Sequence, residues 1–278
     1  MLFIISCYSI LAYHIRLSFY NESWIMVLDL TNVHPTILPY ILGDYRIHLA
    51  GQASQHQKYT CTLHAALATM ESLKKFQYAE FQPPKDFEWI LSAIKLTAEY
   101  KTITEKNIGE EADMAQRGWR RLEAGLYTLQ EIGAEGHNTL QPKKDPIRFK
   151  LKSYSRIDIN ENEGEGLKVA VRDVRAGTVF LIYFRISRNY FTLKPGEIYH
   201  YDATKAYVSP SFSIPASHVV MMIGSGDTVI CTELPNGGTQ CENSVHLNFQ
   251  NSAGKLFGDD GFGKVGSSSV KGLYKITV

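Results

Sequence analysis

The chain has 278 residues, of which 44% are hydrophobic and 21% charged, and its formal net charge is +1. This composition is typical of a globular protein, and the length is sufficient to bury a sizeable core as one large domain or two lobes. A net charge near zero, without a basic cluster interleaved with aromatic residues, argues against a nucleic-acid partner.

Residues 1–40 are interpreted as a leader of unclear status. The run MLFIISCYSILAYHI begins with an apolar stretch like the centre of a signal peptide, but a basic start and a small-residue cleavage site are missing. The stretch is too short to span a bilayer, and no later apolar run reaches the required length. No membrane association is therefore expected.

From about residue 55 to residue 140 the hydrophobic spacing is helical. A helix is predicted from Cys61 onward, because apolar residues recur every three or four positions and neither Gly nor Pro interrupts them: Leu63, Ala66, Leu67, Met70 and Leu73. The stretch EWILSAIKLTAEY, entered through Pro84 and Asp86, predicts a second helix. The stretch AQRGWRRLEAGLYTLQEIG predicts a third, with Gly133 as its stop.

From about residue 141 to residue 278 the pattern changes to strands. RFKLKSYSRI alternates, LKVAVRDV is short and mixed, and GTVFLIYFRI is a nearly continuous apolar run typical of a strand buried on both faces. SHVVMMIG, DTVICTEL, SVHLNFQN and GLYKITV follow, separated by turn residues. The charged stretch INENEGEGLK is interpreted as a solvated connector. The fold class is therefore α+β, with an α-rich lobe followed by a β-rich lobe.

Four cysteines are too few for a disulfide scaffold, and no CxxC pair suggests a zinc site. Cys231 and Cys241 flank TELPNGGTQ, which is typical of a hairpin turn, so these two residues could face each other and form a disulfide in an oxidising compartment. The phosphate-binding patterns GxGxxG and GxxxxGK[ST] are both absent. Neither a metal nor an organic cofactor is expected.

Cys61 stands at the start of the first predicted helix, and two interpretations of it stay open. A cysteine there can be a small apolar core residue, or a nucleophile whose thiolate is favoured by the helix N-terminus. A nucleophile also needs a base and a group that orients the base. His218, at the start of a buried strand, and Asn251, at the end of another, are the candidates.

These stretches together resemble the papain family of cysteine proteases. The family has a Gln six positions before its nucleophilic Cys, as Gln55 stands before Cys61. Its histidine motif is similar to HVVMMIGSG, which begins at His218, and its asparagine motif to NSAGKLFGDDGF, which begins at Asn251. The DYR stretch at residues 44–46 resembles the opening of mature family members. The resemblance covers residues 41–278, with the motifs in the family's order.

The resemblance implies a two-lobed peptidase domain over residues 41–278, with a helical left lobe, an antiparallel, β-barrel-like right lobe and the active-site cleft between them. It implies that Cys61 attacks the peptide carbonyl, His218 serves as base and then acid, and Asn251 orients the imidazole. Gln55 would contribute to the oxyanion hole. Peptide or protein substrates, and proteinaceous inhibitors of cysteine proteases, are the implied partners of what is expected to be a monomer.

The sequence departs from the family around this site. Ala253 and Phe257 stand where the family has tryptophans, and no long propeptide is recognisable in the leader. Ala216 and Ser217 precede the histidine and, with Ala253, are expected to line the substrate cleft; small residues there would admit a bulky apolar side chain.

Two further questions stay open. A catalytically impaired binding or regulatory module is the alternative function, and a protein unrelated to proteases is a third hypothesis. The family is usually vacuolar, lysosomal or extracellular, whereas the weak signal and the missing cysteines also permit the cytoplasm.

Overall fold

The computed structural model describes the backbone of residues 15–20 and 23–28, and most of the chain from residue 60 to residue 278. In this second part the residues left undescribed are 80, 82, 84, 94–95, 98, 101, 103–116, 160–163, 176–177, 209–214 and 234–236. Strands β1 (Ile15–Tyr20) and β2 (Ser23–Leu28) pair as a separate two-stranded antiparallel sheet. The predicted leader otherwise lies outside the described residues.

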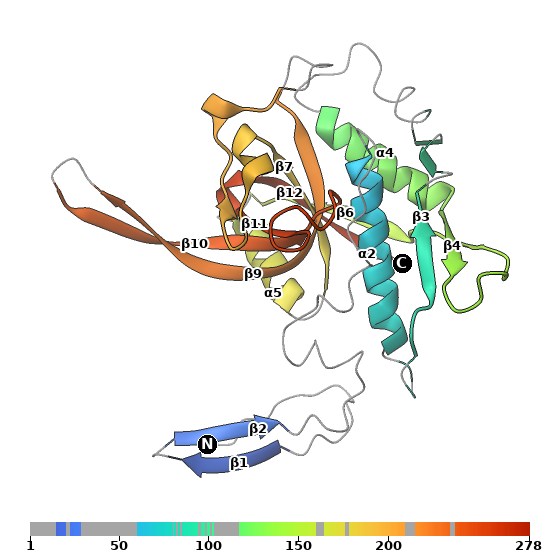
Figure 1. The fold of residues 1–278 in the computed structure, drawn as a ribbon, viewed down its shortest axis with the longest axis horizontal. Coiled ribbons are helices and arrows are strands. Elements are labelled where there is room, and N and C mark those ends of the chain that lie inside the picture. The colour runs from blue at the N-terminus through green and yellow to red at the C-terminus, as the bar shows by residue number, and fades with distance from the viewer. Residues whose placement is uncertain are drawn as a thin grey trace.

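Helix α2 (Cys61–Ala79) runs through the middle of the molecule, between the large sheet and helix α4 (Arg117–Glu131) (Figure 1). Its spacing of apolar residues is the one predicted, and both its sheet-facing and its α4-facing sides are buried. Leu63, Ala66 and Met70 are completely inaccessible to solvent. The predicted first helix is thus confirmed, as is the part of the third helix that the structure describes.

The predicted second helix is wrong in its first half. Residues Trp89–Ser92 form strand β3, which pairs antiparallel with β4 (Ala134–Asn138), and β4 pairs in turn with β5 (Ile147–Phe149). Burial alternates along this strand: Trp89 and Leu91 are buried, and Ile90 between them is exposed. Pairing with a neighbouring strand therefore overrides helical spacing here, and helical residues appear only later, between 96 and 102.

The large sheet has seven strands in the order β6–β12–β7–β9–β10–β11–β8. Its strands span the following residues: β6 (Ser153–Ile157), β7 (Phe180–Arg185), β8 (Ile198–Tyr199), β9 (Ser217–Glu233), β10 (Thr239–Gln250), β11 (Phe262–Gly266) and β12 (Val270–Thr277). All neighbours are antiparallel except β8 and β11, which run parallel. Because β6 and β8 are edges, the predicted barrel-like lobe is an open sheet among the described residues.

Strand β7 is buried on both faces, as its continuous apolar run predicted. Leu181 and Tyr183 contribute to the core around α2, whereas Ile182 and Phe184 contribute to the core on the opposite face. That opposite core is covered in part by α5 (Glu165–Arg175), so the stretch LKVAVRDV is a helix within the strand-rich half of the chain. Short 3-10 turns η4 (Arg188–Thr192), η5 (Ala203–Lys205) and η6 (Ser267–Ser269) complete this half.

Strands β9 and β10 form a long hairpin whose outer part projects away from the body (Figure 1). Beyond Gly226 and His246 the two strands pair only with each other. Cys231 and Cys241 are direct partners in this register, and Cys241 is disulfide-bonded. The predicted turn between them thus joins two paired strands.

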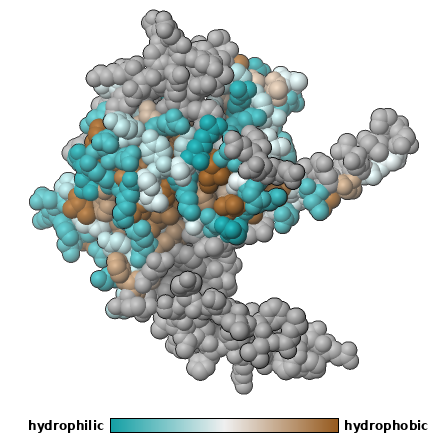
Figure 2. Space-filling view, turned by 180° about the vertical axis from the view of Figure 1, so that it is seen from behind, coloured by the Kyte–Doolittle hydropathy of each residue, from teal (hydrophilic) through white to brown (hydrophobic). Residues whose placement is uncertain are grey.

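Seen from behind, the surface carries several groups of apolar residues separated by hydrophilic ones (Figure 2).

The predicted α+β fold class is confirmed. The predicted boundary between an α-rich and a β-rich lobe lies near residue 140, between β4 and β5. Because these two strands pair with each other, this position does not separate two sheets, and the lobe boundary stays a prediction. In the part of the chain that the structure describes, helices are too short or too polar to cross a bilayer.

Candidate active site

Cys61 is the first residue of α2, and α4 holds this end of the helix closely. A Cβ added at Gly125 of α4 would lie 2.7 Å from the side chain of Thr62, so only glycine permits this approach of the two helices. The helix starts with the His64 N–H donating to the Thr60 carbonyl at 3.2 Å. As the first residue, Cys61 has a backbone N–H without an intrahelical acceptor.

The Cys61 sulfur lies against the start of strand β9. It shares hydrogen bonds with the backbone of Val219, the neighbour of His218, and with the backbone and side chain of Thr62. Although Cys61 is only half-buried as a residue, its sulfur is desolvated. Burial raises the pKa of the thiol above its ordinary value and outweighs these hydrogen bonds and the positive charge of Arg121, which act in the opposite direction.

The hairpin explains why His218 and Asn251 meet. His218 stands near the start of β9, Asn251 directly follows the end of β10, and Gln250 is the register partner of Met221. Two residues far apart in sequence therefore lie side by side at the base of an antiparallel pair. His218 also pairs with Phe184 of β7, so a central strand of the sheet carries it.

The imidazole and the amide are joined by a buried hydrogen bond. His218 Nε2 lies 2.8 Å from Asn251 Oδ1, which also accepts the Ser252 N–H at 2.8 Å. Because an amide oxygen only accepts, Nε2 of a neutral His218 must carry the proton, and its Nδ1 keeps a lone pair. This tautomer can take a proton from a thiol at Nδ1.

Burial has opposite effects on the pKa values of the two candidate reacting groups. His218 is 8% exposed. Desolvation lowers the pKa of its imidazole, and the hydrogen bond from the ring to Asn251 opposes this effect. Since the pKa of the Cys61 thiol is raised, both groups are neutral near pH 7 in this geometry. Burial of the sulfur thus opposes the stabilisation of a thiolate that the helix N-terminus would provide, and the role of Cys61 as a nucleophile stays a prediction.

Aromatic rings surround the His218 side chain. The ring centroids of His218 and Tyr190 are 5.4 Å apart, and those of His218 and Phe184 are 6.1 Å apart. Phe257 contacts the Tyr190 ring with a centroid distance of 4.9 Å. Tyr190 is not predicted from the sequence, because an aromatic-rich stretch gives no indication of which ring will contact the histidine.

The other predicted residues are distributed around this centre. Ala216 and Ser217 are partly buried directly before His218, and Ser217 Oγ lies 2.8 Å from the hydroxyl of Tyr183. Ala253 is exposed in the loop after Asn251. Gln55 lies outside the described residues. Within the described ranges, no group of three His, Cys, Asp or Glu side chains could hold a metal ion.

Comparison with known proteins supports the fold more than the chemistry. No protein-family model matches the sequence, and no curated protein matches it. Among solved structures, procathepsin L 3 from the larval midgut of Tenebrio molitor is 12% identical with a TM-score of 0.50, and the match covers 84% of this chain and 68% of that one.

Two further structures are similar at the same level. ProCathepsin B S9 from Trypanosoma congolense is 12% identical with a TM-score of 0.49, covering 87% of this chain and 75% of that one. Bromelain from Ananas comosus, solved with the E64 inhibitor, is 15% identical with a TM-score of 0.45, covering 84% and 97%. At such identities the likeness concerns the fold alone. The chain has the fold of papain-like cysteine proteases, as the sequence resemblance predicted.

Proposed function

We propose that the protein is a cysteine peptidase that hydrolyses peptide bonds through Cys61, His218 and Asn251. The observation that carries this proposal is the buried 2.8 Å hydrogen bond between His218 Nε2 and Asn251 Oδ1. The Cys61 sulfur is hydrogen-bonded to the backbone of Val219, the residue next to His218. A thiol, an imidazole and an amide in this order supply a nucleophile, a base and an orienting group.

The reaction would begin from a neutral thiol and a neutral imidazole. His218 Nδ1 takes the Cys61 proton while the sulfur attacks the carbonyl carbon of the substrate. The resulting imidazolium donates that proton to the leaving amine, and the acyl group stays on sulfur as a thioester. Water, deprotonated by His218, then attacks the thioester and releases the acid and the free thiol. Asn251 keeps Nε2 protonated and the ring oriented throughout.

Gln55 is proposed to stabilise the oxyanion, together with the N–H of Cys61, which has no acceptor within α2. Removing one such donor typically costs roughly 2.7–4 kcal/mol of barrier. Ala216, Ser217 and Ala253 are proposed to line the substrate cleft. Because none of these three carries a charge, a bulky apolar side chain is expected to be accepted beside His218, and profiling with a peptide library would measure this preference.

A non-catalytic binding module is the second candidate, and one observation favours it. Burial raises the pKa of the Cys61 thiol, so little thiolate exists near neutral pH unless His218 accepts the proton during the reaction. The two candidates therefore differ in whether the Cys61 thiol depends on His218 for its reactivity.

Labelling of the full chain with an epoxide-type thiol inhibitor, combined with a peptide-hydrolysis assay, separates the two. Cys61→Ser should abolish labelling and His218→Ala should reduce both labelling and hydrolysis by at least a hundredfold, in the range typical of general-base loss. His246→Ala is the matched control, since His246 is equally buried at 8% exposure but stands on β10. Labelling that is unchanged in His218→Ala, or hydrolysis that survives Cys61→Ser, would overturn the proposal.

A further inference from the structure

Tyr190 touches both partners of the His218–Asn251 hydrogen bond. Its ring contacts the imidazole edge to face, with a centroid distance of 5.4 Å and an interplanar angle of 63°. Phe257 covers it at 4.9 Å. Tyr190 is 3% exposed and Asn251 is 2% exposed, so this side of the hydrogen bond is closed to water although Ala253 leaves no large side chain nearby.

Three buried polar atoms beside the pair have no hydrogen-bond partner among the described residues. They are the Tyr190 hydroxyl oxygen, Asn251 Nδ2 and the Ser252 hydroxyl oxygen. Burial raises the pKa of the Tyr190 hydroxyl well above its ordinary value, and a contact with the Asn251 side chain opposes that rise. The two side chains are therefore neighbours, and each supplies what the other lacks: an acceptor and a donor.

We infer that Tyr190 is a positioning residue for the proposed reaction. Its hydroxyl accepts a hydrogen bond from Asn251 Nδ2, and its ring excludes water from the His218–Asn251 contact. Asn251 Oδ1 is thereby directed at His218 Nε2. The inference deepens the proposed function and rests on it for its effect on the rate.

The physical reason is the near-symmetry of an amide. If the Asn251 side chain turned over, Nδ2 would face the protonated Nε2 of His218, and two donors would oppose each other. The Ser252 N–H holds the oxygen from one side. A hydroxyl acceptor at Nδ2 disfavours the flipped amide from the other side, because burying an unpaired donor is costly.

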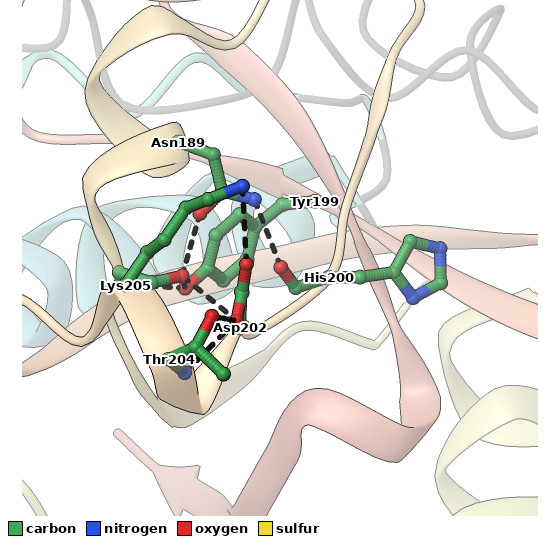
Figure 3. A network of polar contacts seen from close by, with 7 residues as sticks. Asn189, Tyr199, His200, Asp202, Thr204 and Lys205 are labelled. Atoms are coloured by element: carbon green, nitrogen blue, oxygen red, sulfur yellow. Dashed lines mark hydrogen bonds and ion pairs between the residues drawn. The ribbon is translucent and has the colours of Figure 1, made fainter.

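The turn that carries Tyr190 is itself held by a polar network (Figure 3). Ser187, completely buried, donates to Asn189 Oδ1 at 2.5 Å and lies 2.9 Å from the Tyr199 hydroxyl. The Asn189 amide donates to the His200 carbonyl at 3.0 Å. The start of η4 is thus tied to the segment around β8, next to the position of Tyr190.

An NMR titration of the His218 imidazole in the full chain tests this role without requiring peptidase activity. Tyr190→Phe keeps the ring and removes the hydroxyl. Because the Asn251 hydrogen bond raises the imidazole pKa, we expect that pKa to fall in Tyr190→Phe. Tyr274→Phe is the matched control: Tyr274 is also buried, but its hydroxyl donates to Glu123 at 2.6 Å. An unchanged pKa in Tyr190→Phe would overturn the inference.

A double-mutant cycle shows whether Tyr190 acts through the amide. In an Asn251→Ala background, Tyr190→Phe should leave the imidazole pKa unchanged; an equal fall in both backgrounds would mean that the hydroxyl acts on the ring directly, and would overturn the inference. In the otherwise unaltered chain, kcat/KM should fall roughly two- to tenfold in Tyr190→Phe, the usual effect of one neutral hydrogen bond. If the chain hydrolyses no peptide while the pKa cycle behaves as expected, the proposed function fails and the positioning role stands.

Discussion

Glu71 provides a test of the core that can be worked out from its surroundings. It lies on α2, is 6% exposed, and accepts the Leu91 N–H of β3 at 2.6 Å. Burial raises the pKa of its carboxyl to about 7, from an ordinary 4.5, against the opposing effects of the Leu91 hydrogen bond and the positive charge of Lys75. At about 1.4 kcal/mol per pH unit, this difference amounts to about 3 kcal/mol.

The direction of the pH dependence follows from the raised pKa: the folded state binds the Glu71 proton more tightly than the unfolded state does. The stabilising effect is fully present below about pH 4.5 and is lost as the pH rises through about 7. Glu71→Gln keeps an oxygen for the Leu91 N–H and cannot ionise. Compared with the unaltered chain, it should therefore gain about 3 kcal/mol in free energy of unfolding on going from acidic conditions to pH 8, most of it between pH 5 and pH 8.

Urea unfolding of both proteins at pH 5 and pH 8 measures this difference. Glu165→Gln serves as the control, since the Glu165 side chain is 59% exposed and forms an ion pair with an exposed Lys168. It should leave the pH dependence unchanged. If the stability difference between Glu71→Gln and the unaltered chain were the same at both pH values, the argument that desolvation of Glu71 dominates would be wrong.

Three further outcomes are expected. Alkylation of Cys61 by iodoacetamide should accelerate about tenfold per pH unit from pH 6 to beyond pH 8, because burial raises the thiol pKa; a rate independent of pH would indicate a preformed ion pair. Gly263→Ala should lower stability by about 1–3 kcal/mol in thermal unfolding, because its Cβ would lie 2.5 Å from the buried ring of Phe249. Cys241→Ser should leave hydrolysis and inhibitor labelling unchanged, since Cys241 stands on the outer, two-stranded part of the hairpin; a large loss of activity would contradict this.

The sequence alone was sufficient to predict an element where the apolar residues of one segment follow a single regular spacing. The spacing from Leu63 to Met70 predicts α2, and the apolar run around Leu181 predicts β7, because local periodicity reports how many faces of a segment are buried. Helical spacing also links Leu167 with Ala170 and Val174 in α5, within a stretch that was interpreted only as mixed. The types of residue at positions 61, 218 and 251 were enough to nominate them for chemistry.

Tertiary structure decided which segments become neighbours. Trp89–Ser92 is a strand because β4 pairs with it, and spacing within the segment carries no information about that partner. The sequence nominates His218 and Asn251 by their residue types, but the register of β9 and β10 sets the distance between their side chains. The pKa of Cys61 likewise depends on atoms from α2, α4 and β9 together, since desolvation sums over everything that replaces water around the sulfur. The contact of Tyr190 with the imidazole has the same origin: it exists only after a turn from one part of the chain packs on a strand from another.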